Sequence, residues 1–167
     1  GPNHVIQMIN GGSGAYFVVF NKTGNALTNV TYLDNYMGFS GGGGDPIVLY
    51  DEAADRWLMS EFANGGNVLH VAISTSPDPL GNWYTYTYNA TNFPDYPKYS
   101  IWNDAYIVTT NENVSAVYAL NRAQMLAGSS GTAQRFSVPS FGTIGFQAAT
   151  PVSLNGTTSP PSGTPGM

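Results

Sequence analysis

The chain has 167 residues, a net charge of −5 and a charged fraction of only 9%. Five lysine and arginine residues cannot line a phosphate backbone, so the composition argues against a nucleic-acid partner. No apolar run approaches the roughly 18–20 residues of a membrane-spanning helix, and the lack of cysteine excludes thiolate chemistry, a zinc ribbon and a disulfide framework.

The first forty residues are predicted to form an incomplete unit of short strands, 3–40. Apolar alternation indicates strands at 3–10 and 15–25, and a third strand is predicted at 28–32. The glycine-rich stretch 39–45 is expected to be a flexible connector into the next part of the chain.

The middle of the chain repeats one pattern of strands and turns. GDPIVLYDEAADRWLMSEF (44–62) and DYPKYSIWNDAYIVTTNE (95–112) both contain an acid, a proline, an apolar strand, a polar turn and a second strand. Matching residues lie 47–51 positions apart, as in Pro46 and Pro97, Trp57 and Tyr106, and Gly81 and Gly128. A repeat of this length, built from short strands, is typical of four-stranded antiparallel β-propeller blades.

We therefore predict an all-β protein made of blades at 45–90 and 94–140, with a partial blade at 143–155. With 3–40 this gives about three and a half units, fewer than the four that a closed ring requires. The whole chain is predicted to be one partial β-propeller domain, an incomplete ring.

Two segments outside this pattern are identified by composition. NRAQMLAG gives the one helical pattern, predicted at 121–127 and ended by Gly128. The segment 156–167 is rich in Pro, Gly and Ser and is predicted to be a linker-like tail.

One ordered set of motifs covers nearly the whole chain: GPNHVIQMIN, AYFVVFNKTGN, GDPIVLYDEAADRWLMSEFA, VAISTSPDPLGNWYTYTYN, FPDYPKYSIWNDAYIVTTNE and ALNRAQMLAG. This set resembles a family of secreted or surface-exposed bacterial β-propeller proteins. The resemblance implies an extracellular or cell-surface location, and a ring that continues past PPSGTPGM (160–167), so that this chain would be its N-terminal part. It implies no activity, because propellers host binding and catalysis alike.

Three acidic residues are candidates for catalysis. Asp45 precedes the proline of the first blade, and Asp104 and Glu112 flank a strand of the second. A pair of carboxylates about 5–10 Å apart would suit glycoside hydrolysis. The alternative is ordinary turn chemistry, because aspartate before proline also begins strands without any catalytic role.

The turns 51–56 and 111–115 contain oxygen-rich side chains that suit calcium, a cation that takes 6–8 oxygen ligands. The candidate ligands are Asp51, Asp55 and Glu112. Acidic turn tips also occur for solubility alone, so a calcium site is one of two interpretations. His70, within the strand VLHVAIS, is expected to be a hydrogen-bonded strand residue rather than a metal ligand.

Aromatic residues are the stronger functional signal. Candidate ligand-binding residues, which could stack on sugar rings or anchor a protein partner, are Tyr84, Tyr86, Tyr88, Tyr96 and Trp102. The alternative is that most of these rings pack between neighbouring blades. Five sequons permit glycosylation without indicating it, at Asn21, Asn29, Asn89, Asn113 and Asn155.

These patterns predict an extracellular binding or structural module that recognises carbohydrate or protein. A propeller-type glycoside hydrolase or lyase is the first alternative, and a self-assembling structural subunit is the second. Because an incomplete ring leaves apolar blade faces open, we expect Val5 to Ile9 and Phe146 to Val152 to lie against other copies or the remainder of the propeller.

Overall fold

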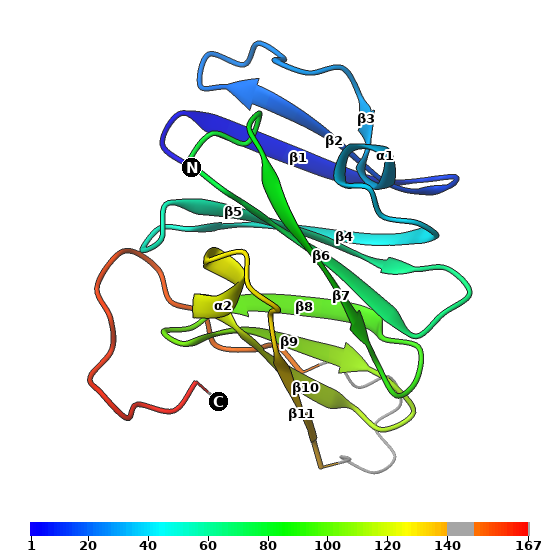
Figure 1. The fold of residues 1–167 in the computed structure, drawn as a ribbon, viewed down its shortest axis with the longest axis vertical. Helices are drawn as coiled ribbons and strands as arrows, with labels where there is room; N and C mark the ends of the chain where they lie inside the picture. Colours follow the sequence, from blue (N-terminus) through cyan, green and yellow to red (C-terminus); the bar gives the residue numbers. More distant parts are fainter. Residues whose placement is uncertain (140–148, 167) are drawn as a thin grey trace. The chain divides into compact units, whose positions relative to one another are not determined.

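The structure is a computed structural model that describes residues 1–139 and 149–166. These residues form 11 strands in three antiparallel sheets and two helices of five residues each (Figure 1). The prediction of an all-β protein is confirmed. None of the helices among these residues has the length and apolar character needed to cross a membrane. The chain divides into two compact units, Gly1–Ala90 and Thr91–Met167.

The first unit contains two antiparallel sheets. The three-stranded sheet is made of β1 (His4–Gly11), β2 (Gly14–Asn21) and β3 (Thr31–Tyr32). The four-stranded sheet is made of β4 (Gly42–Asp51), β5 (Arg56–Ala63), β6 (Val68–Ser74) and β7 (Trp83–Asn89). In both sheets neighbours in sequence are neighbours in space, as short turns between antiparallel strands require.

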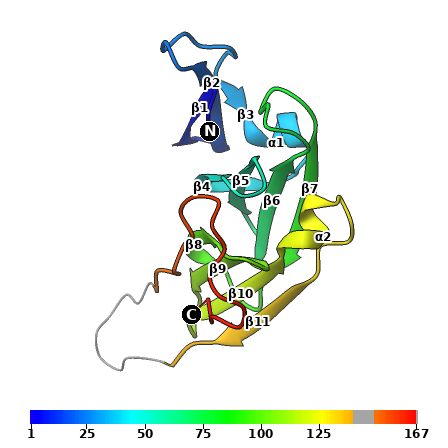
Figure 2. The ribbon, with the colours of Figure 1, turned by 90° about the vertical axis from the view of Figure 1, so that its left-hand side faces the viewer.

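The core of this unit lies between the two sheets, which Figure 2 shows one above the other. Alternate residues of each strand point to one face. Phe17 and Val19 of β2 therefore pack in one cluster with Trp57 and Met59 of β5. The residues of β2 that point the other way are mostly half-buried, whereas β5 is buried on both faces.

A five-residue helix, α1 (Leu33–Met37), follows β3 and closes one side of this core. Leu33 and Met37 lie four positions apart, on one face of the helix, and both are buried. Gly38 ends the helix with φ 71° and donates its N–H to the carbonyl of Asp34. The expectation of a single helix was therefore wrong, because one helical turn is too short to produce a visible 3.6-residue pattern.

The glycine stretch predicted as a connector, 39–45, instead contains the start of β4 at Gly42. A Cβ atom on Gly43 would lie 2.8 Å from the Phe62 ring, so a side chain there would collide with the neighbouring strand. Glycine at this place lets two strands approach closely rather than making the chain flexible.

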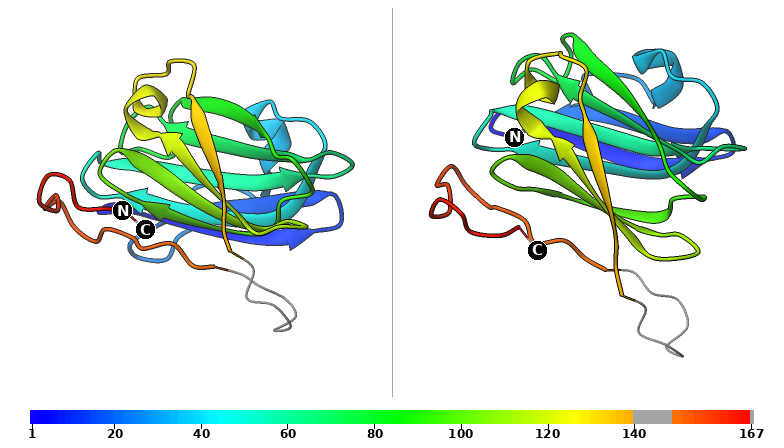
Figure 3. Two further views of the ribbon diagram at one scale, coloured as in Figure 1. Left: turned by 90° about the horizontal axis from the view of Figure 1, so that it is seen from below. Right: turned by 60° about the horizontal axis from the view of Figure 1, so that its bottom comes forward.

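The second unit contains one four-stranded sheet of β8 (Asp95–Ile101), β9 (Ala105–Asn111), β10 (Ala116–Asn121) and β11 (Ala133–Ser137). Helix α2 (Arg122–Leu126) follows β10, as predicted for 121–127 (Figure 3). The side chain of Asn121 caps it by accepting the N–H of Gln124. Trp102, Ile107 and Val117 form a small core cluster.

The partial blade predicted at 143–155 falls partly on residues 140–148, which lie outside the described residues. In the described part, 149–155 forms no strand, although the N–H of Leu154 bonds to the carbonyl of Ile101 in β8. Pro151 contributes no N–H to a ladder, which disfavours a regular strand here.

The two four-stranded sheets share one register. Tyr50 pairs with Trp57 across β4 and β5, and Ile101 pairs with Tyr106 across β8 and β9. Residue 101 is 51 positions after residue 50, and residue 106 is 49 positions after residue 57, so the intervening turn is two residues shorter in the second sheet. The sequence repeat is therefore a repeat of strand pairing.

Candidate functional site

A cleft of about 550 Å³ opens in the first unit beside α1 and the start of β7. Its lining consists of Tyr36, Met37, Leu80, Gly81, Asn82, Trp83 and Thr85. The volume is within the usual range for sites that bind small ligands. Tyr36 is 38% exposed and Leu80 41% exposed, so aromatic and aliphatic surface is accessible at its mouth.

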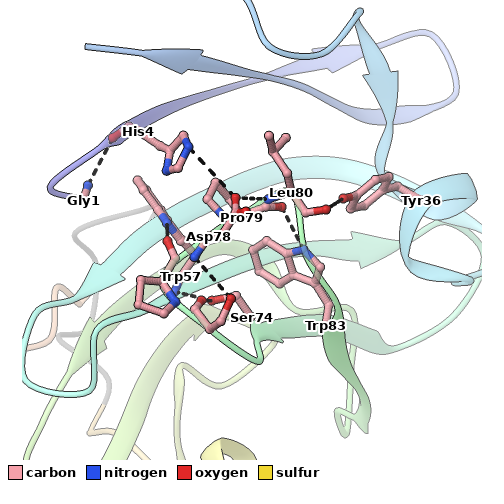
Figure 4. A network of polar contacts seen from close by, with 11 residues as sticks. Gly1, His4, Tyr36, Trp57, Ser74, Asp78, Pro79, Leu80 and Trp83 are labelled. Carbon is pink, nitrogen blue, oxygen red and sulfur yellow. Dashed lines mark hydrogen bonds and ion pairs between the residues drawn. The ribbon is translucent and has the colours of Figure 1, made fainter.

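The loop 75–82, which forms one wall of the cleft, is held by three aromatic side chains (Figure 4). The indole Nε1 of Trp57 donates to the carbonyl of Pro77 at 3.1 Å. Trp83 donates in the same way to Pro79 at 3.1 Å, and the hydroxyl of Tyr36 reaches the carbonyl of Leu80 at 3.4 Å. Every one of these donors comes from a strand or helix outside the loop.

Further polar contacts order the loop. Asp78 Oδ1 accepts the N–H of Leu80 at 2.9 Å, and the Ser74 hydroxyl donates to the carbonyl of Ser76 at 2.7 Å. His4, on β1, places its Nε2 atom 4.0 Å from Oδ1 of Asp78. A wall fixed at this many points loses little conformational freedom when a ligand binds, and such preorganisation favours affinity.

The chemistry of the lining is aromatic and uncharged. None of the seven lining residues is acidic or basic. Burial raises the pKa of Tyr36, so its hydroxyl stays neutral; it donates to the Leu80 carbonyl, and its oxygen can still accept a hydrogen bond. The Asn82 amide and the Thr85 hydroxyl can both donate and accept. This combination suits a neutral ligand that presents both an apolar face and hydroxyl groups.

The predicted tyrosine row alternates with threonine along β7, and the structure separates its members by exposure. Tyr84 is 36% exposed, whereas Tyr86 and Tyr88 are buried. Burial raises the pKa of both Tyr86 and Tyr88. A buried ring has no free face for a ligand, so Tyr84 is the accessible member of the row, and it lies outside the lining of the cleft.

The other two predicted ligand-binding residues lie in the second unit. Tyr96 is 44% exposed, and the ammonium group of Lys98 lies 3.5 Å from the centre of its ring. Trp102 is 8% exposed and packs against Ile107 and Val117. Tyr96 is therefore accessible, while Trp102 serves the core of its unit.

The structure does not bring Asp104 and Glu112 together. Asp104 precedes β9 and Glu112 follows it, so a strand of seven residues separates them. At about 3.3 Å per residue the two residues are about 25 Å apart, too far for the paired carboxylates of a glycosidase. Asp45, in the first unit, exchanges hydrogen bonds with Asn10 of β1, which is a structural role in a strand bulge.

Glu112 is the centre of a buried polar cluster. One carboxylate oxygen accepts the hydroxyls of Thr110 and Tyr118, and the other accepts a guanidinium N–H of Arg135 at 2.9 Å. The side chain of Glu112 has no exposed surface. Its oxygens are thus satisfied by the protein itself.

The calcium candidates do not form a multi-carboxylate centre. Asp51 accepts the N–H of Ala54 within its own turn, and Asp55 bonds to the hydroxyl of Tyr50. Glu112 belongs to the separate cluster of the second unit. Among the described residues, no group of three or more His, Cys, Asp or Glu side chains could hold a metal ion.

The sequons differ in how accessible they are. Asn21 is half-buried and its side-chain oxygen accepts the N–H groups of Thr23 and Asn25, which orders a turn. The exposed members are Asn29, Asn89, Asn113 and Asn155. His70 is buried, stacks on Phe39 and contacts the carbonyl of Ser40 and the hydroxyl of Thr87. It is the hydrogen-bonded strand histidine that was predicted.

The sequence did not identify the cleft itself. Tyr36, Leu80 and Asn82 lie in a short helix and a loop, far apart in the chain, and nothing in their local pattern marks them. A usable signal was the turn-rich stretch TSPDPLGNW, which ends in an aromatic residue. Comparisons with protein-family models, with curated proteins and with solved structures give no match.

Proposed function

We propose that this chain is an extracellular or cell-surface binding module and that its cleft takes a neutral carbohydrate. The observation that carries the proposal is the uncharged lining, in which the exposed ring of Tyr36 and the half-buried ring of Trp83 occur together with the polar side chains of Asn82 and Thr85. A sugar ring has an apolar face that packs on aromatic rings and hydroxyl groups that need hydrogen-bond partners.

The support for this proposal is physical. Tyrosine and tryptophan provide large contact area with few rotatable bonds, so ordering them on binding costs little entropy. The loop that carries Leu80 and Asn82 is already braced by Trp57, Trp83 and Tyr36. The lining offers no charged group to pair with an ionic ligand, and a neutral polysaccharide is therefore favoured.

The test is binding of the purified chain to neutral and acidic polysaccharides, measured by affinity electrophoresis and by calorimetry with oligosaccharides. We expect binding to a neutral polysaccharide and a loss of at least about tenfold in affinity for Tyr36→Ala, as for a ring that anchors a ligand. Tyr84→Ala is the matched control, because Tyr84 has nearly the same exposure, 36% against 38%, and lies outside the lining.

Three results would contradict the proposal: no binding to any neutral polysaccharide, equal loss in both variants, or loss in Tyr84→Ala alone. The last would move the site to the tyrosine row of β7. Thermal unfolding of each variant checks that the chain still folds. This control is needed because Tyr36 also contacts the ring of Phe17 edge-on.

We also infer that β4–β7 and β8–β11 are successive blades of a β-propeller, in one partial domain. The support is the shared register of the two sheets and the shared position of their bulges, between Gly44 and Ile47 in one and between Asp95 and Lys98 in the other. Four strands in sequential antiparallel order are the usual content of a blade. The resemblance to secreted bacterial propeller proteins agrees with this inference and with the proposed location.

In this proposal the outer face of the three-stranded sheet is where a further blade stacks, supplied by another copy or by the remainder of the ring. Val5 and Ile9 of β1 are 46% and 62% exposed there, opposite Phe20 and Tyr16 of β2. The second expected interface segment is Phe146 to Val152. Its residues up to 148 lie outside the described part of the chain, and Val152, which is described, is 56% exposed.

Sedimentation velocity over a range of protein concentrations tests this interface. We expect self-association of the chain, weakened by Ile9→Lys and kept in the control Val30→Lys, which changes a loop residue that is 70% exposed. A compact monomer at every concentration, with wild-type behaviour in both variants, would contradict it.

A further inference from the structure

The interior of the first unit holds two acidic side chains. Asp34, on α1, is 5% exposed and Glu61, on β5, is 0% exposed. Neither residue takes part in the cleft or in the predicted catalytic set. Burying a carboxylate is costly unless it is paired, so two in one place require an explanation.

The two carboxyl groups lie against each other above Gly42. A Cβ atom built on Gly42 would be 2.6 Å from Asp34 Oδ1 and 2.6 Å from Glu61 Oε2. These two oxygens are therefore no farther apart than twice that distance. The missing side chain of glycine leaves the space that the carboxyl groups occupy.

Few hydrogen-bond donors surround the pair. Asp34 Oδ2 accepts the N–H of Gly42 at 2.8 Å and the hydroxyl of Tyr32 at 3.1 Å. Glu61 Oε2 accepts the N–H of Ala15 at 3.0 Å, and a backbone hydrogen bond from Gly44 also favours the charged form of Glu61. The remaining oxygens, Asp34 Oδ1 and Glu61 Oε1, are buried and have no donor. The pair therefore has fewer donors than two buried negative charges would require.

No cation neutralises the pair in the part of the chain that the structure describes. The titratable groups around it are Tyr32 of β3, Tyr16 of β2, which contacts Tyr32, and His70 of β6, which pairs with Glu61 in register. The ring nitrogens of His70 lie against the carbonyl of Ser40 and the hydroxyl of Thr87 rather than against Glu61.

We propose that Asp34 and Glu61 share one proton in the folded protein, and that this proton clamps α1 to the four-stranded sheet. The protonated carboxyl group of Glu61 donates a hydrogen bond to the carboxylate of Asp34. This supplies the donor that Asp34 Oδ1 lacks. The pair also accepts hydrogen bonds from Ala15 of β2 and Gly42 of β4. The shared proton therefore links four elements: α1, β2, β4 and β5. Loss of the proton leaves two buried negative charges in contact.

The electrostatics agree with this geometry. Burial first, and then the contact with Asp34, raise the pKa of Glu61 from 4.5 to about 8. Between these two values the folded chain holds a proton that the unfolded chain has lost. The stability that this proton contributes is therefore fully present below about pH 4.5 and is lost as the pH rises through this window to about 8.

The experiment is urea unfolding of the whole chain between about pH 5 and pH 9, with Glu61→Gln as the test variant. Glutamine keeps a donor in place of the carboxylic acid and cannot ionise. Glu52→Gln, at an exposed turn position, is the matched control. We expect the urea concentration at the unfolding midpoint to decrease in the wild type and in the control as the pH is raised to about 8. In Glu61→Gln this decrease should be absent.

A fall of the same size in Glu61→Gln would overturn the proposal. Because this variant could fail to fold, carbon-13 NMR of the glutamate carboxyl groups in the wild type provides a second measurement. One glutamate should titrate near pH 8, with the amide signals of Ala15 and Gly42 shifting at the same midpoint. Titration of every glutamate near its ordinary value would refute proton sharing.

A further unfolding experiment distinguishes a shared proton from a bound metal ion. Calcium chloride at about pH 8, compared with sodium chloride at equal ionic strength, should leave the unfolding midpoint of the wild type unchanged. A calcium-specific rise that disappears in Glu61→Gln would overturn the proposal in favour of a metal at this pair.

Discussion

Asp45 and Tyr96 occupy the same place in two different sheets. Each precedes a proline, each has a positive φ, 49° and 51°, and each lies within the bulge of its first strand. The two positions are 51 residues apart, which is also the spacing of Pro46 and Pro97. A left-handed backbone is unusual for residues other than glycine, so its recurrence shows that the bulge is a conserved feature of the repeat within this chain.

The left-handed backbone at Tyr96 predicts sensitivity to β-branching. Tyr96→Val should lower the free energy of unfolding by about 1 kcal/mol or more, because a branched Cβ clashes with the backbone at positive φ. Tyr84→Val changes a comparably exposed tyrosine inside a regular strand, where valine is favoured, and should be close to neutral. Urea denaturation compares the two. Equal effects would argue against the left-handed conformation.

The space above Gly42 predicts a strong effect of one methyl group. Gly42→Ala should lower the free energy of unfolding by about 1–3 kcal/mol, because its Cβ would lie 2.6 Å from oxygens of both Asp34 and Glu61. Gly12→Ala is the control, since a Cβ there has nothing within 4 Å. Thermal unfolding of both variants checks this. A neutral Gly42→Ala would mean that the two carboxyl groups do not lie where the structure places them.

The cluster around Glu112 predicts dependence on its cation. Arg135→Met keeps the aliphatic stem but leaves the buried carboxylate without its ion pair, and should cost about 3 kcal/mol of unfolding free energy. Arg122→Met removes a guanidinium that donates at the surface to the carbonyl of Asn103, and should cost less than about 1 kcal/mol. Denaturant titrations at one pH and salt concentration compare the variants, and similar losses would contradict the buried-pair interpretation.

The separation of the predicted acids leads us to expect no glycosidase turnover. Asp104 and Glu112 lie at opposite ends of β9, and Glu112 is enclosed by Thr110, Tyr118 and Arg135. Release of reducing ends from a panel of polysaccharides should stay at the level of a buffer blank. Hydrolysis that Asp45→Asn abolishes would disprove this and support the hydrolase alternative.

Much of the fold was predictable because short-range sequence patterns indicate strands. Alternation, prolines and turn residues located the strands of both four-stranded sheets, and the spacing from Trp57 to Tyr106 anticipated their common register. Helix α2 was predictable from its pattern and its terminal glycine, whereas α1 was not, because a single turn depends on the burial of Leu33 and Met37 against other elements.

The candidate site was much less predictable. The sequence showed that tyrosines and threonines alternate along β7, but burial decided that Tyr84 is accessible and Tyr88 is not. The cleft depends on a contact between Tyr36 and the loop that carries Leu80, two segments more than forty residues apart. No local pattern encodes such a contact, since it is set by how two sheets and a helix pack.

The sequence by itself determined the class of the protein and its periodicity, because strand propensity and turn chemistry act over a few residues. Only the tertiary structure decided which acids are solvated and which are buried. Asp34 and Glu61 lie 27 residues apart in the chain and meet because Gly42 leaves room between α1 and β5. Contact between charged groups depends on the packing of whole elements, and the identity of neighbouring residues in the sequence does not reveal it.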